Sequence, residues 1–164
     1  YLQVIGGKTA SLSRTSARLG AMAADASPEV IEDLATWAWE VGMVFQIADD
    51  ALDLVADEAT IGKPAGSDIR EGTFTAPVLM AAAGPDGERI RHLLTTDEPL
   101  SDAAVDEVIA LVRDGGFVDL SLDSARERLD LARDALSRLP DGEPRRILET
   151  LGEYLLDRVQ AIQD

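Results

Sequence analysis

The amino-acid sequence predicts an all-α protein, a single helical bundle formed by most of the 164 residues. Twenty-four alanines and 21 leucines dominate the apolar residues, whereas aromatic residues make up only 4%. This composition favours helices and is poor in the β-branched and aromatic residues that sheets require. Apolar residues also recur three and four positions apart, which is the spacing of one helix face. The length is that of one domain of ordinary size.

The first two helices are predicted from apolar spacing and from a capping signal. Residues 1–25 form the first, and three large apolar residues mark the side expected to face the core: Leu12, Leu19 and Met22. Ser27 is a typical N-cap and Pro28 a typical first helical residue, so a second helix of about 28 residues begins there. Glu40 is the only charged residue between positions 34 and 48. A helix that is apolar most of the way round belongs in the middle of a bundle.

The rest of the chain is predicted to be a loop followed by five helices. Glycine and proline interrupt residues 56–72, which indicates a loop. Short helices are expected at 75–83 and 88–95, and Ser101 caps a third helix that ends at the glycine pair 115–116. Two longer amphipathic helices follow, one stopped at 140–142 and one beginning near Pro144.

Charge and composition exclude several functions. Thirty-one acidic residues against 15 basic ones leave a net charge of −16, which repels nucleic acids and anionic lipids unless a metal ion intervenes. The absence of cysteine and the single His92 exclude disulfides, zinc–thiolate sites and the usual catalytic triads. Neither a membrane span nor a signal segment is expected, so the predicted location is cytoplasmic. A helical pattern that starts at Tyr1 without methionine suggests a piece of a longer protein.

Three aspartates form an acidic triplet at the end of the apolar second helix: Asp49, Asp50 and Asp53. The spacing of Asp49 and Asp53 places their carboxylates one above the other on a helix. At about 6 Å and an effective dielectric constant near 20, two such charges repel by roughly 3 kcal/mol. Hard oxygen ligands in this arrangement suit Mg²⁺. The alternative is a solvated helix end in a protein that is acidic throughout.

The two lysines lie in glycine-rich surroundings, although the chain has thirteen arginines. Lys8 follows two glycines and precedes Thr9, and Lys63 lies in the segment 62–68, which holds Gly62 and Gly66. A lysine is a compact point charge suited to a phosphate oxygen. A P-loop is excluded because Leu2 stands where the motif requires its first glycine and no strand precedes it.

Four motifs, taken in order and spacing, resemble the C-terminal half of a trans-isoprenyl diphosphate synthase of the polyprenyl synthetase family. They are the Lys-Thr pair at 8–9, the Phe-Gln-Ile-Ala-Asp-Asp-Ala-Leu-Asp stretch at 45–53, the Gly-Lys-Pro-Ala-Gly-Ser-Asp segment at 62–68 and the Glu-Gly-Thr-Phe-Thr-Ala-Pro segment at 71–77. The resemblance implies that residues 1–164 are the C-terminal part of an isoprenoid-synthase fold, an all-α helical bundle.

The family implies head-to-tail transfer: an allylic diphosphate ionises to a carbocation, the double bond of isopentenyl diphosphate attacks it, and a proton is lost. In an acidic protein, the departing diphosphate needs Mg²⁺ and a few cations. By resemblance, Asp49 and Asp53 hold one Mg²⁺, directly or through water, with Asp50 close by. Lys8 and Lys63 contact the allylic diphosphate.

Four further residues match family positions with less direct roles. The oxygens of Thr9 and Gln46 match positions that face the developing carbocation. Phe45 matches one that packs on the isopentenyl chain, and Asp68 is a candidate outer-shell acid. Thr73 stands where the family often has lysine, which points to a long-chain polyprenyl product. Because product length is set largely near the first Asp-rich motif, the expected product is a medium- or long-chain polyprenyl diphosphate.

That first Asp-rich motif and the family's arginine and lysine that bind isopentenyl diphosphate are absent from this sequence. We therefore expect the chain alone to be inactive, and the resemblance implies a homodimer for the full-length protein. A second hypothesis is a non-catalytic helical module, such as the partner subunit of a two-chain synthase or an unrelated bundle with acidic helix ends. The presence of both lysines and all three aspartates favours the enzyme.

Overall fold

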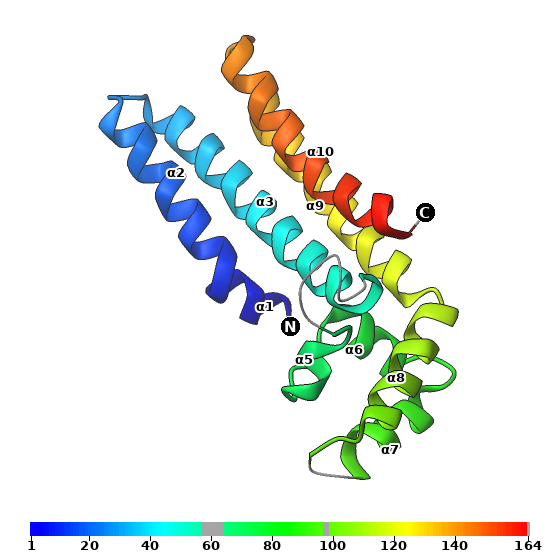
Figure 1. The fold of residues 1–164 in the computed structure, drawn as a ribbon. Helices are drawn as coiled ribbons and strands as arrows, with labels where there is room; N and C mark the ends of the chain where they lie inside the picture. The colour runs from blue at the N-terminus through cyan, green and yellow to red at the C-terminus, as the bar shows by residue number, and fades with distance from the viewer. Residues whose placement is uncertain (57–63, 97–98, 164) are drawn as a thin grey trace. The chain divides into compact units, whose positions relative to one another are not determined.

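The computed structural model describes residues 1–56, 64–96 and 99–163, and the regular structure in these ranges is helical, without a strand (Figure 1). The all-α prediction is therefore confirmed. The helices are α1 (Leu2–Ile5), the π-helix η1 (Gly6–Ala10), α2 (Ser11–Ala23), α3 (Pro28–Val55), α5 (Ser67–Arg70), α6 (Ala76–Ala82), α7 (Gly87–Thr96), α8 (Asp102–Asp114), α9 (Phe117–Ser137) and α10 (Glu143–Gln163).

The chain divides into two compact units. Unit 1 comprises Tyr1–Ala48 and Ser124–Arg158, and unit 2 comprises Asp49–Asp123 and Val159–Asp164. Helices α3, α9 and α10 contribute residues to both units. No described helix has a stretch long and apolar enough to cross a membrane.

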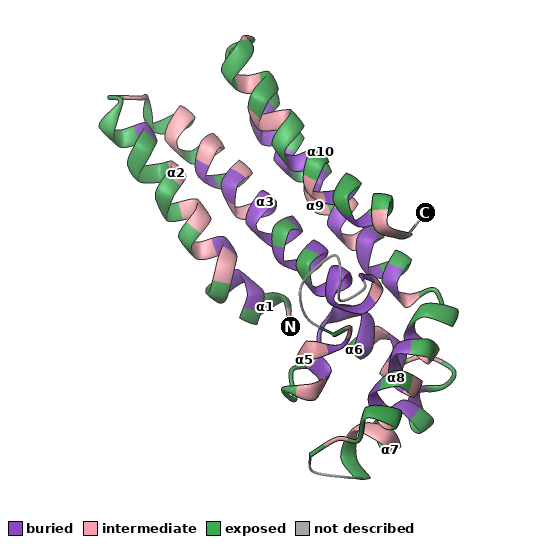
Figure 2. Cartoon of the chain, in the orientation of Figure 1, coloured by how far each residue is buried: buried purple, intermediate pink, exposed green. Residues whose placement is uncertain are grey.

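Unit 1 is organised around the first 21 residues of α3. The predicted cap is confirmed, because the Ser27 hydroxyl accepts the backbone N–H of Val30 at 3.4 Å. Buried residues run along this part of the helix (Figure 2). Glu40 is only 8% exposed and accepts a hydrogen bond from Arg128 of α9 at 3.0 Å. This ion pair explains how the one charged residue of the apolar stretch is tolerated in the core.

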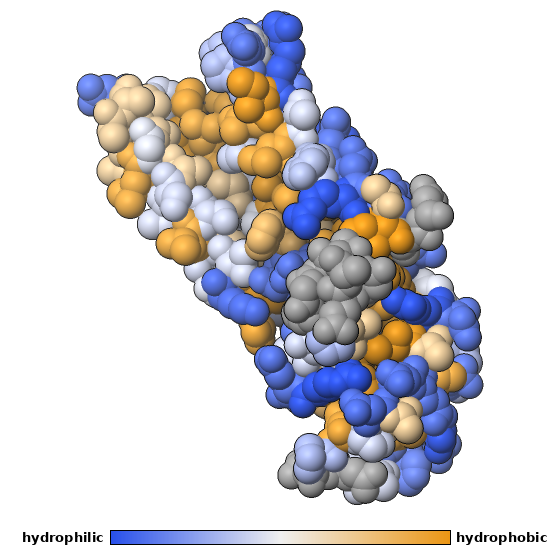
Figure 3. All heavy atoms as spheres, viewed as in Figure 1, coloured by the Kyte–Doolittle hydropathy of each residue, from blue (hydrophilic) through white to orange (hydrophobic). Residues whose placement is uncertain are grey.

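The first predicted helix differs from expectation in two ways. A π-helical turn, η1, separates α1 from α2 where a continuous α-helix was predicted. The three residues predicted to face the core, Leu12, Leu19 and Met22, are 70%, 60% and 55% exposed, so that prediction is wrong. The buried residues here are small instead: Ala10, the last residue of η1, and Ala21 of α2. Apolar atoms accordingly reach the surface over α2 and α3 (Figure 3).

Small residues face α3 because the helices approach closely. A Cβ added at Gly42 of α3 would lie 2.8 Å from the Cα of Ala10. This contact leaves no room for a large side chain between η1 and α3.

Unit 2 packs short helices around α8. The Ser101 hydroxyl accepts the N–H of Ala104 at 3.2 Å, which confirms the predicted cap. The face of α8 that carries Val105, Val108 and Val112 is buried.

Residues 56–72 were predicted to be a loop, and among the described residues 64–72 this is wrong for Ser67–Arg70, which form α5. Gly66 precedes α5 with a φ of 74°, a left-handed conformation that favours glycine. A Cβ at Gly66 would also lie 2.7 Å from Cδ1 of Ile109, so both backbone angle and packing require glycine here.

Candidate functional site

In unit 1, the structure brings together two predicted site residues, Thr9 and Gln46. The Thr9 hydroxyl, on η1, donates to Oε1 of Gln46 on α3 at 2.7 Å. Gln46 is 6% exposed and Thr9 is half-buried, so the bond is shielded from solvent. π-Helical turns occur frequently at functional sites, and this one carries the Lys-Thr motif.

Two other predicted residues of unit 1 are exposed. Lys8 lies on η1 beside Thr9, with its side chain open to solvent. Phe45 of α3 is 45% exposed, although it is a large aromatic residue between the buried Val44 and Gln46. Both side chains are therefore accessible to a ligand.

The acidic triplet lies in unit 2, on the last two turns of α3. Asp49 is exposed, whereas Asp50 and Asp53 are only 4% and 3% exposed. The triplet therefore presents one carboxylate to solvent and two to the protein interior.

Asp53 is held by the turn that precedes α5. Its Oδ2 accepts the backbone N–H of Asp68 at 3.1 Å, and its backbone carbonyl accepts the N–H of Gly66 at 2.8 Å. An N–H in the first turn of a helix has no intrahelical partner, so Asp53 acts as a cap supplied from another element. Asp68 takes part in this contact through its backbone N–H, and the role of its carboxylate as an outer-shell acid stays a prediction.

Arg113 also contacts this end of α3, and sequence reasoning did not single it out. Its Nε donates to the carbonyl of Leu54 at 2.7 Å, from the last turn of α8. An arginine near the end of its own helix gave no signal of this long-range bond. For Gly66, the signal was present in the glycine-rich motif, but its partner Asp53 was assigned only to metal binding.

The predicted pairing of both lysines with the triplet stays a prediction. Lys63 lies outside the described residues, and Lys8 belongs to unit 1 while the triplet belongs to unit 2.

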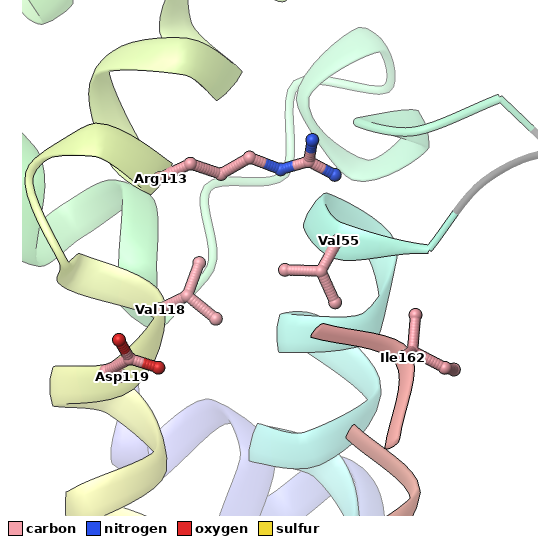
Figure 4. A pocket seen from close by; sticks show the side chains of 5 residues that line it. All are labelled: Val55, Arg113, Val118, Asp119 and Ile162. Atoms are coloured by element: carbon pink, nitrogen blue, oxygen red, sulfur yellow. The ribbon is translucent and has the colours of Figure 1, made fainter. Parts of the chain in front are cut away.

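A cavity of about 270 Å³ in unit 2 is lined by none of the predicted site residues (Figure 4). Its lining consists of Val55, Arg113, Val118, Asp119 and Ile162. The cavity thus adjoins the end of α3 through Val55 and Arg113.

Within the described ranges, no three histidine, aspartate or glutamate side chains form a ready-made metal site. The donor set of the triplet nonetheless fits Mg²⁺, which binds oxygen and is typically held by one or two carboxylates, with waters and substrate phosphates completing the shell. Asp49 is exposed, so its carboxylate is accessible to such an ion.

The sequence was compared with models of protein families and with known proteins. The model of the family described as "Polyprenyl synthetase" matches residues 1–112. The chain belongs to the polyprenyl synthetase family. It is 38% identical over 161 residues to a nonaprenyl diphosphate synthase of Mycobacterium tuberculosis, covering 96% of this chain and 48% of that protein.

Two other polyprenyl synthetase relatives are similarly close. Component 2 of a heptaprenyl diphosphate synthase of Geobacillus stearothermophilus is 37% identical, over 94% of this chain and 48% of that protein. A structure of geranylgeranyl pyrophosphate synthase from Corynebacterium glutamicum, complexed with calcium and isoprenyl diphosphate, matches with a TM-score of 0.88 and 38% identity, over 97% of this chain and 50% of that chain. These matches confirm the family and the fold predicted from the four motifs. This polyprenyl synthetase chain spans about half the length of these relatives, which agrees with the predicted C-terminal half.

Proposed function

We propose that the native protein carrying this chain condenses an allylic diphosphate with isopentenyl diphosphate, head to tail. The allylic carbon–oxygen bond breaks and diphosphate leaves with the bonding electrons, after which the isopentenyl double bond forms the new carbon–carbon bond and a proton is lost. The proposal rests on the acidic end of α3, where Asp53 accepts the backbone N–H groups of Gly66 and Asp68. The chain that carries this feature is 38% identical to a nonaprenyl diphosphate synthase.

In this proposal the three aspartates of the acidic triplet bind one divalent ion. Asp49, whose side chain is exposed, and Asp53, which is 3% exposed and already accepts a backbone N–H, would hold the ion directly or through water. Asp50, which is 4% exposed, would lie close by. Lys8 and Lys63 contact the allylic diphosphate as point charges. Mg²⁺, when bound, neutralises the charge of the departing diphosphate.

Thr9 and Gln46 stabilise the carbocation in the same scheme. A threonine hydroxyl has one hydrogen and two lone pairs, and Thr9 donates its hydrogen to Gln46. Its oxygen therefore keeps lone pairs that can face positive charge. Phe45, which is 45% exposed, packs on the isopentenyl chain.

The test is Mg²⁺-dependent binding of inorganic pyrophosphate to the native protein, measured by isothermal titration calorimetry. Hydrogen bonds to charged groups contribute about 1.5–3 kcal/mol, so Asp49→Asn and Lys63→Ala should each weaken binding about tenfold or more. Asp157→Asn, an exposed aspartate of α10, is the matched control and should leave binding unchanged. Unchanged affinity in both site variants would contradict the assignment.

We also propose that the 164-residue chain alone does not elongate an allylic diphosphate. The family's first Asp-rich motif and the arginine and lysine that bind isopentenyl diphosphate do not occur in this sequence. Extension of farnesyl diphosphate with labelled isopentenyl diphosphate is the assay, and product above background from the purified chain would contradict this statement.

A second candidate is a non-catalytic partner subunit. Its support is the 37% identity to a protein named component 2 of a heptaprenyl diphosphate synthase, a name that indicates a synthase of more than one component. Turnover by the native protein alone favours the enzyme, whereas turnover that requires a second, co-purified chain favours the subunit.

For the enzyme, we propose a cytoplasmic homodimer that makes a medium- or long-chain polyprenyl diphosphate. Light scattering after size exclusion tests the dimer, and chromatography of the dephosphorylated products tests their length. A monomer or a short-chain product would contradict the corresponding part.

A further inference from the structure

The carboxyl end of α3 is closed by groups from elsewhere in unit 2. The last four carbonyls of an α-helix have no partner within the helix. The carbonyl of Asp53 accepts the N–H of Gly66 at 2.8 Å, and that of Leu54 accepts Nε–H of Arg113 at 2.7 Å. Two adjacent carbonyls are thus satisfied by residues 13 and 59 positions away along the chain.

Arg113 makes its bond from the last turn of α8. Its side chain extends toward the end of α3, which carries Val55 (Figure 4). The 2.7 Å separation between Nε and the carbonyl oxygen lies at the short end for an N–H···O bond, as is typical when the donor is charged.

This end of α3 requires a cation for electrostatic reasons. The carboxyl terminus of a helix carries partial negative charge, which disfavours acidic side chains there. The acidic triplet nevertheless lies within the last seven residues of α3. Like charges at this spacing also repel each other. A guanidinium group at the Leu54 carbonyl opposes both effects.

We propose that Arg113 is a positioning residue for the acidic triplet. By bonding to the Leu54 carbonyl, it keeps the last turn of α3 closed and so holds the adjacent Asp53 where it accepts the N–H groups of Gly66 and Asp68. This inference rests on the proposed function, because it assigns the triplet to a metal-bridged diphosphate.

The direction in which Mg²⁺ affinity changes when Arg113 is replaced distinguishes a positioning role from a purely electrostatic one. A cation near a metal site weakens metal binding by repulsion, so removing only its charge would tighten binding of Mg²⁺. Loss of positioning has the opposite effect, because residues that orient metal ligands typically contribute about 10–100-fold in affinity.

The experiment uses the native protein with MgCl₂ and inorganic pyrophosphate as the probe, measured by calorimetry. Arg113→Met, which keeps the apolar stem, should weaken binding about tenfold. Arg113→Lys keeps a charge and a donor but loses the planar fork, and should weaken binding about threefold. Arg89→Met removes an exposed arginine of α7 in the same unit and should leave binding unchanged.

Amide hydrogen exchange provides a readout that does not depend on the metal. In Arg113→Met, the amides of Gly66 and Asp68 should exchange faster than in the wild type, because both donate to Asp53. In Arg89→Met they should be unchanged.

Wild-type or tighter pyrophosphate affinity in both Arg113 variants would overturn the proposal, as would unaltered exchange at Gly66 and Asp68. If Arg113→Met does not fold, Arg113→Lys decides by the same two measurements. Failure of the wild-type protein to bind pyrophosphate with Mg²⁺ would instead refute the proposed function, so the two failures are distinguishable.

Discussion

Gly42→Ala should destabilise unit 1 even though alanine is the better helix former. The added Cβ would lie 2.8 Å from the Cα of Ala10 and 3.1 Å from Oγ of Ser13. Real Cβ atoms essentially never approach other heavy atoms closer than 3.0 Å. Because Cα of Ala10 belongs to the backbone, it cannot rotate away, and η1 must move from α3.

The magnitude follows from two opposing effects. Overpacking in a well-packed core costs about 1–3 kcal/mol, whereas replacing glycine by alanine inside a helix gains about 1 kcal/mol. We therefore expect Gly42→Ala to lower the free energy of unfolding by up to about 2 kcal/mol. The shift of η1 should also weaken the 2.7 Å bond from Thr9 to Gln46.

The assay is urea denaturation of the native protein, followed by circular dichroism. Gly20→Ala is the matched control, because Gly20 lies in α2 and its added Cβ meets nothing within 4 Å. It should raise the free energy of unfolding by up to about 1 kcal/mol. Equal stabilisation by both substitutions would refute the close approach of η1 and α3.

Two further predictions concern ion pairs. Arg128→Met leaves the buried carboxylate of Glu40 without its 3.0 Å partner, so the free energy of unfolding in urea should fall by about 3 kcal/mol. Arg133→Met removes an ion pair at the surface and should lower the free energy of unfolding by less than about 1 kcal/mol. Equal losses in the two variants would refute burial of the Arg128–Glu40 pair. The hydrogen bond from Arg89 holds the pKa of Glu107 below its usual range, so the pair stabilises the fold at neutral pH and this contribution is lost as the pH falls through the lowered pKa. The melting temperatures of wild type and Glu107→Gln should therefore converge at low pH, and a constant difference would contradict this.

Helix ends and the chemistry of the acidic triplet were predictable from the sequence because they depend on near neighbours. Ser27 and Ser101 cap helices through N–H groups three residues away, a distance that local patterns specify. The i, i+4 spacing of Asp49 and Asp53 is a property of any helix.

The buried side of α2 was not predictable in the same way. Large apolar residues such as Leu12 and Leu19 normally mark the core side of a helix, yet they are exposed here. Gly42 approaches Ala10 of η1, directly before α2, so closely that only a small residue fits there, and that approach depends on residues 32 positions apart.

The sequence alone therefore determined the all-α class, most helix ends, the family resemblance and the candidate residues for diphosphate chemistry. The tertiary structure decided that Thr9 bonds to Gln46, that Asp53 caps the start of α5 and that Arg113 closes the end of α3. Local patterns follow from the geometry of one helix turn. Contacts between distant residues follow from how closely helices pack, which no single stretch of sequence encodes.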